Sequence, residues 1–130
     1  MEDVALLVAR LCMGVPFIIW GFGKLRNRGA ELIPGLRALG IPDPAAFAFL
    51  VGACEFLGGL AVLIGYPLRT ASVLLGLWCL LTGYDAHRGN QTELFKNITM
   101  AGGYFALAVA GAGALSLWGG SAPGILGWLP

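Results

Sequence analysis

Residues 44–66 read PAAFAFLVGACEFLGGLAVLIGY, a run of 23 residues that is apolar except for one carboxylate, Glu55. A helix needs about 20 mostly apolar residues to cross the roughly 30 Å hydrocarbon core of a bilayer. The run has that length, and Glu55 is its twelfth residue. The stretch therefore predicts a membrane-spanning helix that carries an acid near the middle of the bilayer.

The composition of the whole chain agrees with a membrane protein. Of its 130 residues, 58% are hydrophobic and 12% are charged, and that charged fraction is about half of what soluble domains carry. The net charge of +1 offers no basic surface of the kind that nucleic-acid binding needs. We expect one domain, residues 1–130, with the lipid bilayer as its surroundings and no nucleic acid among its partners.

Charge, proline and glycine divide the chain into four apolar segments. Backbone polar groups must be paired inside lipid, so each segment should be an α-helix, and strand-like alternation is absent. Gly65, Tyr66 and Pro67 alone join the second segment to the third, which predicts a tight hairpin. The predicted fold is an all-α membrane protein, a four-transmembrane-helix up-down bundle. Its spans are residues 4–25, 44–66, 68–84 and 97–118.

The segments between and after the spans predict the orientation. Residues 26–43 form an interfacial loop, in which AELIPGLRALG is an amphipathic stretch, and residues 119–130 form an interfacial tail anchored by Trp118 and Trp128. The positive-inside rule places basic ends in the cytoplasm. It predicts cytoplasmic loops 26–43 and 85–96 with both termini outside, because one side carries Lys24, Arg26, Arg28, Arg37, Arg88 and Lys96 and the other carries Arg69 and Arg10.

Glu55 lies on a face of small residues, since Gly52, Gly58 and Gly59 are its neighbours at helical spacing. Small residues mark close helix approaches in membranes, so Glu55 should point into the bundle. The first span has a matching stripe of Arg10, Gly14, Phe17, Gly21 and Lys24. We predict an Arg10–Glu55 ion pair. The sequence leaves two roles open for it, a functional site and a structural pair that fixes helix register.

A second polar cluster is predicted at the cytoplasmic end, from Lys24, Asp85, His87, Lys96 and Asn97, with Tyr104 on the same helix face as Asn97. The alternative for Lys24, Arg69, Asp85 and Lys96 is that each reaches water by snorkelling. His87 is the only histidine, and Cys12, Cys54 and Cys79 form no CxxC pair. We therefore expect no metal site, and we expect the cysteines to act as small buried hydrophobes.

Four stretches of the chain resemble the DoxX family of small four-helix bacterial inner-membrane proteins: RLCMGVPFIIWGFGKL, ALGIPDP, GACEFLGGLAVLIGYPLRTAS and KNITMAGGYFALAVAGAGALSL. Where many members have an aspartate after the last serine-leucine pair, this chain has Trp118. The family pattern falls on Arg10, Gly14, Phe17, Gly21, Lys24, Glu55, Gly58, Gly65, Arg69, Asn97, Gly111, Gly113 and Ser116.

The resemblance implies an oxidoreductase-associated role, because members are linked to quinone-coupled sulfur oxidation and to oxidative-stress complexes. Our first hypothesis is a quinone- or quinol-interacting subunit, with Glu55 as the catalytic candidate and Phe17 and Tyr104 near the ring. A bound quinone is then the one cofactor implied, since the sequence has no haem, flavin or iron–sulfur spacing. A proton-coupled or small-solute transporter and a scaffold are the alternatives, and partners would be further copies of the chain or redox proteins. No reaction is assigned to the chain alone.

Overall fold

The computed structural model describes residues 1–87 and 89–117, and every regular element in this part of the chain is a helix. The long helices are α1 (Glu2–Arg26), α3 (Pro44–Ile64), α4 (Leu68–His87) and α5 (Gln91–Ala110). A short helix, α2 (Ile33–Ala38), forms inside the predicted amphipathic stretch. The predicted class, all-α, is therefore confirmed for the described residues.

Local sequence signals set the helix ends. Asp43 caps α3 by accepting a hydrogen bond from the Ala46 backbone N–H at 3.0 Å, directly before Pro44, and Asn90 caps α5 by accepting from Thr92 and Glu93. Both are N-cap arrangements that satisfy otherwise unpaired backbone donors. Each cap marks a boundary that the composition of the apolar segment does not show.

The fourth helix differs from the predicted span 97–118. It begins six residues earlier, at Gln91, and it ends at Ala110. The early start follows from the Asn90 cap, and the early stop from Gly111, whose φ of 87° is a conformation that glycine adopts without steric cost. Residues 111–117 continue without helix. Trp118 and the predicted tail 119–130 lie outside the described residues.

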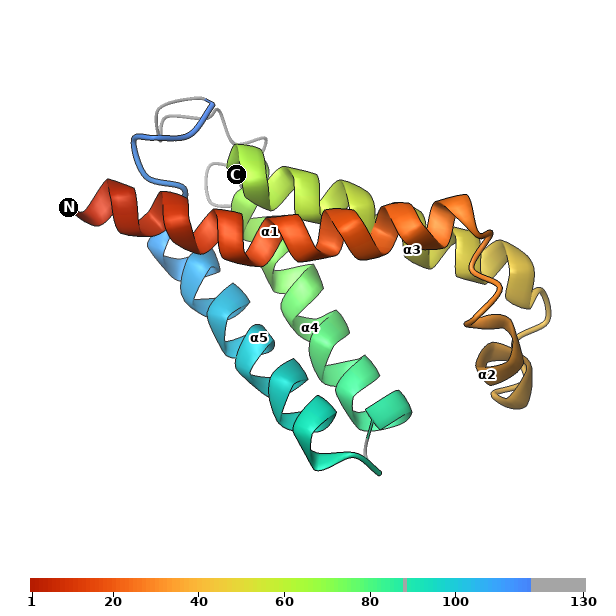
Figure 1. Ribbon diagram of the computed structural model, residues 1–130. Coiled ribbons are helices and arrows are strands. Elements are labelled where there is room, and N and C mark those ends of the chain that lie inside the picture. The colour runs from red at the N-terminus through yellow and green to blue at the C-terminus, as the bar shows by residue number, and fades with distance from the viewer. Residues whose placement is uncertain (88, 118–130) are drawn as a thin grey trace.

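The long helices form two pairs, α1 with α3 and α4 with α5, and the contacts within each pair are the most extensive in the fold (Figure 1). Glycines bring α1 and α3 together: a Cβ on Gly14 would lie 2.8 Å from the Gly59 carbonyl, and one on Gly21 would lie 2.7 Å from the Gly52 carbonyl. Small residues let membrane helices approach this closely. The two helices are antiparallel, with Gly14 against Gly59 and Gly21 against Gly52.

The predicted hairpin between the second and third segments has its short connection at residues 65–67, but its two helices diverge from there. In Figure 1, α4 leaves the end of α3 at a wide angle, so the two pairs diverge from the 65–67 connection. The reason is steric, because the small face of α3 is occupied by α1, while α4 presents Leu74, Leu75 and Trp78 toward α3. A space between α3 and α4 results, and it is where the site described below lies.

A small core holds the two pairs together where they meet. It includes Phe17 of α1, Val62 of α3, Cys79 of α4 and Tyr104 of α5, all at most 3% exposed. The ring centroids of Phe17 and Tyr104 lie 5.5 Å apart in an edge-to-face arrangement, and the Tyr104 hydroxyl donates to the Met13 carbonyl at 2.8 Å. This core fixes how α5 sits against α1.

Much of the outer surface is apolar. Two helices, α1 and α3, are long and apolar enough to cross a membrane by length and composition. Soluble monomers rarely expose contiguous apolar patches beyond a few hundred Å². Here exposed large hydrophobic side chains occur on all four long helices, among them Ile19, Phe49, Leu57, Leu74, Leu81, Ile98 and Val109.

Candidate functional site

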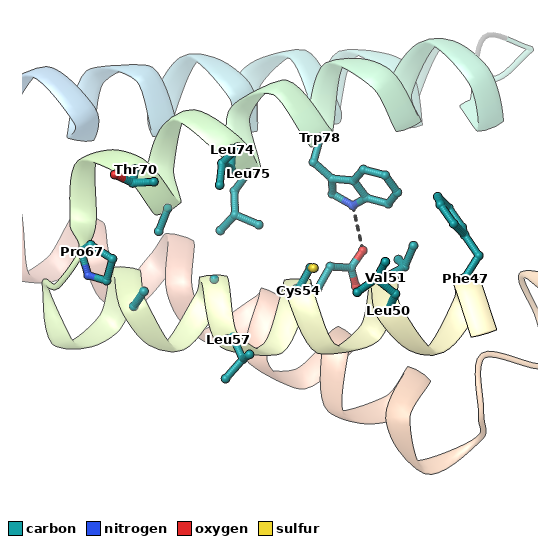
Figure 2. Close-up of a pocket in the computed structure, with 14 residues that line it drawn as sticks. Phe47, Leu50, Val51, Cys54, Leu57, Pro67, Thr70, Leu74, Leu75 and Trp78 are labelled. Carbon is teal, nitrogen blue, oxygen red and sulfur yellow. Dashed lines mark hydrogen bonds between the residues drawn. The ribbon is translucent and has the colours of Figure 1, made fainter. Parts of the chain in front are cut away.

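Glu55 is 5% exposed and lies on α3 between α1 and α4. Its Oε2 accepts a hydrogen bond from Lys24 Nζ at 2.5 Å, which is also an ion pair. Its Oε1 accepts from the Trp78 indole Nε1–H at 2.9 Å, marked by the dashed line in Figure 2. Side chains from three helices, α1, α3 and α4, therefore meet at one carboxylate.

The predicted Arg10–Glu55 pair is wrong, and the helix register explains why. The facing glycines of α1 and α3 place Glu55 level with Ile18. Lys24 is six residues from that level and Arg10 is eight, or about 9 Å and about 12 Å along the helix axis at 1.5 Å per residue. Lys24, on the same face as Arg10, is the cation within reach.

Arg10 has a different environment, although it is 1% exposed. Its guanidinium donates to the Leu63 carbonyl at 3.2 Å and to the Leu115 carbonyl. Leu63 belongs to the last turn of α3, where carbonyls lack helical partners and a cation is favoured by the helix dipole. Arg10 thus joins three parts of the chain at one end of the molecule: α1, the end of α3 and the segment 111–117.

A cavity of about 550 Å³ lies between α3 and α4, and Glu55 is on its wall (Figure 2). Figure 2 shows Leu57, Cys54 and Phe47 on the α3 side and Thr70, Leu75 and Trp78 on the α4 side. The lining is otherwise almost wholly apolar. Small-molecule sites commonly have volumes of about 300–1,000 Å³, mostly apolar walls and few polar groups, and this cavity has each property.

The other predicted site residues separate into two groups. Lys24, His87, Lys96 and Asn97 line a second cavity of about 390 Å³ on the other side of Glu55. Lys96 forms an ion pair with Glu93 in the first turn of α5. Asp85 and Arg69 are exposed and line neither cavity. Phe17 lines the second cavity from the core, whereas Tyr104 lines neither.

Two residues of the site were not predicted. Trp78 supplies the second donor to Glu55, and its sequence signal was weak because an isolated Trp in an apolar run is common. Cys54 lines the α3–α4 cavity and is exposed, as is Cys12, while Cys79 is buried. The expectation of three buried cysteines is thus correct only for Cys79, because the outer faces of α1 and α3 are themselves apolar.

A fold of long apolar helices around a buried carboxylate defines a class of small helical membrane proteins, and comparison with known proteins identifies the family. The DoxX family model matches residues 5–88, which contain Arg10, Lys24, Glu55 and Trp78. The chain therefore belongs to the DoxX family.

Two relatives from Escherichia coli K12 match along most of their length. The chain is 37% identical to inner membrane protein YqjF over 122 residues, which cover 90% of this chain and 92% of that protein. It is 29% identical to inner membrane protein YphA over 126 residues, covering 89% of each. No solved structure is significantly similar to the chain.

Proposed function

We propose that this chain is a bacterial inner-membrane protein in which α1, α3, α4 and α5 all cross the bilayer. The names of the two relatives support the location. The 20 residues of α4 and of α5 give each a length of about 30 Å, which equals the thickness of the hydrocarbon core. The basic residues Arg26, Arg28 and Arg37 favour a cytoplasmic 26–43 connection with both termini outside.

Cysteine labelling tests this topology. In a variant whose three native cysteines are replaced by alanine, Glu2→Cys should react with a membrane-impermeant maleimide in intact spheroplasts, and Arg28→Cys only after lysis. The opposite pattern would reverse the orientation. Equal labelling of both positions in intact spheroplasts would place both ends of α1 outside. In that case α1 would not cross the bilayer, and the four-span arrangement would be wrong.

Within the membrane, we propose that the chain binds a quinone or quinol as a subunit of a membrane oxidoreductase system. The observation that carries this proposal is the position of Glu55, at 2.9 Å from Trp78 on the wall of an apolar cavity of about 550 Å³. A quinol hydroxyl needs an acceptor, which the carboxylate supplies. A quinone carbonyl needs a donor, and the single indole N–H supplies one when it turns from Glu55 Oε1 to the bound carbonyl. The apolar walls suit the ring and the start of its isoprenoid tail.

We propose a separate role for each of the three side chains that meet at the site. Trp78 orients the bound head group, and Glu55 takes a proton from a quinol hydroxyl while Lys24 stabilises the carboxylate charge. Oxidation of a quinol to a quinone releases two protons, which Glu55 takes and passes on one after the other, and two electrons, which we assign to a partner redox protein. This assignment makes the chain a binding and proton-transfer subunit. Further copies of the chain, or other membrane subunits, complete the system.

Fluorescence quenching tests the ligand site directly. In lipid nanodiscs, a variant that keeps only Trp78 (Trp20, Trp118 and Trp128 replaced by phenylalanine) should show saturable quenching by a short-chain ubiquinone analogue. Glu55→Gln in that background should weaken the apparent affinity about tenfold, equivalent to about 1.4 kcal/mol. Asp85→Asn, which changes an exposed carboxylate that lines neither cavity, is the matched control.

The alternatives predict other results. A scaffold gives only non-saturable quenching, equal in the two carboxylate variants. A proton-coupled transporter gives proton flux into liposomes that stops in Glu55→Gln without any added quinone. Either result would remove the quinone proposal.

A further inference from the structure

The second cavity, of about 390 Å³, shares Val51, Glu55 and Trp78 with the α3–α4 cavity. It lies between α1, α3, α4 and α5, and its lining includes seven polar or charged residues: Lys24, Glu55, Thr82, His87, Glu93, Lys96 and Asn97. The hydrogen bond from Trp78 to Glu55 therefore separates two spaces of different character. The α3–α4 cavity has almost wholly apolar walls, whereas the second cavity has polar groups among apolar ones such as Phe17 and Met100.

The second cavity connects Glu55 with the aqueous end of the helices. His87 is the last residue of α4, and Glu93 is in the first turn of α5. The Lys96 side chain is 49% exposed, whereas that of Glu55 is 7% exposed. Between Glu55 and Lys96, the Thr82 hydroxyl, which donates to the Trp78 carbonyl at 2.9 Å, lies 3.4 Å from Asn97 Oδ1. Asn97 Nδ2 donates to the Glu93 carbonyl at 2.9 Å. Polar groups thus accompany the cavity over its length.

A cavity of this kind has the properties that ordered water needs. Water enters a space that has polar partners and room for at least one molecule, about 30 Å³ in the liquid, and the cavity exceeds that volume many times. Its charges are balanced, with Lys24 paired to Glu55 and Lys96 paired to Glu93, which argues against a site for a fixed anion or cation. Lys24 lines this cavity and not the apolar one.

From these observations we infer that the second cavity is a hydrated vestibule through which Glu55 exchanges protons with water at the α4–α5 connection. Glu55 then faces lipid-soluble ligand on one side and water on the other. The inference rests on the proposed quinone function only for the identity of that ligand. A proton taken from the apolar cavity leaves through the vestibule, past Lys24, Asn97 and Thr82, without crossing the ligand site.

Two carbodiimides of different solubility test the two-sided access. A carbodiimide activates a carboxylic acid, and an adjacent amine then displaces the activating group as a urea and forms an amide. The water lost by the acid and the amine is taken up by the carbodiimide, which becomes the urea. Because Lys24 Nζ lies 2.5 Å from Glu55, the expected product is a Lys24–Glu55 cross-link, measured by mass spectrometry of the joined peptides. In nanodiscs, both the water-soluble reagent EDC and the apolar reagent dicyclohexylcarbodiimide should form it.

Matched variants separate the two routes. Asn97→Leu replaces a polar group of the vestibule with an apolar one of similar size, and should slow the EDC cross-link at least fivefold while changing the dicyclohexylcarbodiimide cross-link less than twofold. Cys54→Leu, in the apolar cavity, should have the reverse effect. The unchanged reaction in each variant shows that the Lys24–Glu55 pair is still folded. The Glu93–Lys96 pair at the mouth is an internal reference for EDC.

The vestibule is overturned if EDC does not cross-link Lys24 to Glu55 in the wild type, or if Asn97→Leu slows both reagents equally. A short-chain quinone, added to the same samples, should slow dicyclohexylcarbodiimide and leave EDC unaffected. If the quinone protects against neither reagent although the variants still separate them, the proposed ligand fails and the vestibule stands. If it protects but the variants do not separate the reagents, the ligand site stands and the vestibule fails.

Discussion

Two buried charged residues, Arg10 and Glu55, belong to the same helix pair but have opposite kinds of partner. Arg10 donates to backbone carbonyls of Leu63 and Leu115 and lines neither cavity. Glu55 accepts from two side chains, Lys24 and Trp78, and lines both cavities. Side-chain partners can move without unfolding the backbone, whereas backbone partners cannot. We therefore assign Arg10 to stability and Glu55 to function.

This contrast refines the rule that ionisable residues inside a membrane span are functional by default. Both residues satisfy the rule, yet one fixes the end of α3 and the segment 111–117, and the other stands between two cavities. The partner type and the adjacent space distinguish them. Variants of the two residues and of their partners test that distinction.

Replacing Arg10 should have the largest effect on stability. Arg10→Leu leaves the Leu63 and Leu115 carbonyls without their charged donor, and hydrogen bonds to charged groups contribute about 1.5–3 kcal/mol each. We expect a loss of about 3–6 kcal/mol in the free energy of unfolding, measured by titration with SDS in mixed micelles. Arg10→Lys, which keeps the charge and can reach one carbonyl, should lose about half as much.

The assignment of Arg10 also predicts what does not change. In the fraction of Arg10→Leu protein that remains folded, the short-chain quinone should quench the Trp78 fluorescence with the same apparent affinity as in the protein that keeps Arg10. A fully folded Arg10→Leu protein that fails to bind would show that Arg10 belongs to the ligand site, and the contrast drawn above would be lost.

The close contact of α1 with α3 should give the next largest effect. A Cβ on Gly21 would lie 2.3 Å from the Phe56 backbone nitrogen, whereas one on Gly23 has nothing within 4 Å. Gly21→Ala should therefore lower the free energy of unfolding by about 3 kcal/mol, the upper end of the usual range for overpacking. Gly23→Ala is the matched control and should be neutral or stabilising by about 0.5–1 kcal/mol.

Because the same contact fixes the register, Gly21→Ala should also weaken the Lys24–Glu55 cross-link. An unchanged cross-link yield in a destabilised Gly21→Ala protein would mean that Lys24 reaches Glu55 independently of the register, and our explanation of the wrong Arg10 pairing would fail.

A double-mutant cycle on Lys24 and Glu55 should reveal a smaller energy. The pair is largely buried, and neighbouring charged residues typically show coupling energies of about 0.5–3 kcal/mol. We expect a coupling on the order of 1–2 kcal/mol from Lys24→Met, Glu55→Gln and the double variant, measured by the same SDS titration. The cycle of Arg10→Leu with Glu55→Gln should give about zero, and a coupling as large as that of Lys24 would restore the pairing predicted from the sequence.

Sequence alone predicted the helical class, the buried position of Glu55 and the stripe of α1 that faces it. It failed on the partner of Glu55, because reach along a helix depends on register, and the register is set by which of several glycines pair. It also failed on the angle between α3 and α4. The short 65–67 connection keeps the two helices close at that end, but it does not determine how far apart their other ends lie. The α3–α4 cavity follows from that angle, so it could not be predicted. Of the predicted cytoplasmic cluster, Lys24, His87, Lys96 and Asn97 do line the second cavity, and only Asp85 does not.

The smallest effect concerns the attachment of residues 111–117 near Arg10. The Asp3 carboxylate accepts a hydrogen bond from the Ala114 backbone N–H at 2.7 Å. Asp3→Ala should cost about 0.5–1.5 kcal/mol, the usual net value of one hydrogen bond. Glu2→Ala, which removes a neighbouring charge from the same first turn, controls for the helix dipole. If Arg10 and Asp3 hold the same segment, Asp3→Ala should cost less in the Arg10→Leu background than in the wild type. Equal costs in both backgrounds would show that the two attachments act independently, and would restrict the structural role of Arg10 to the end of α3.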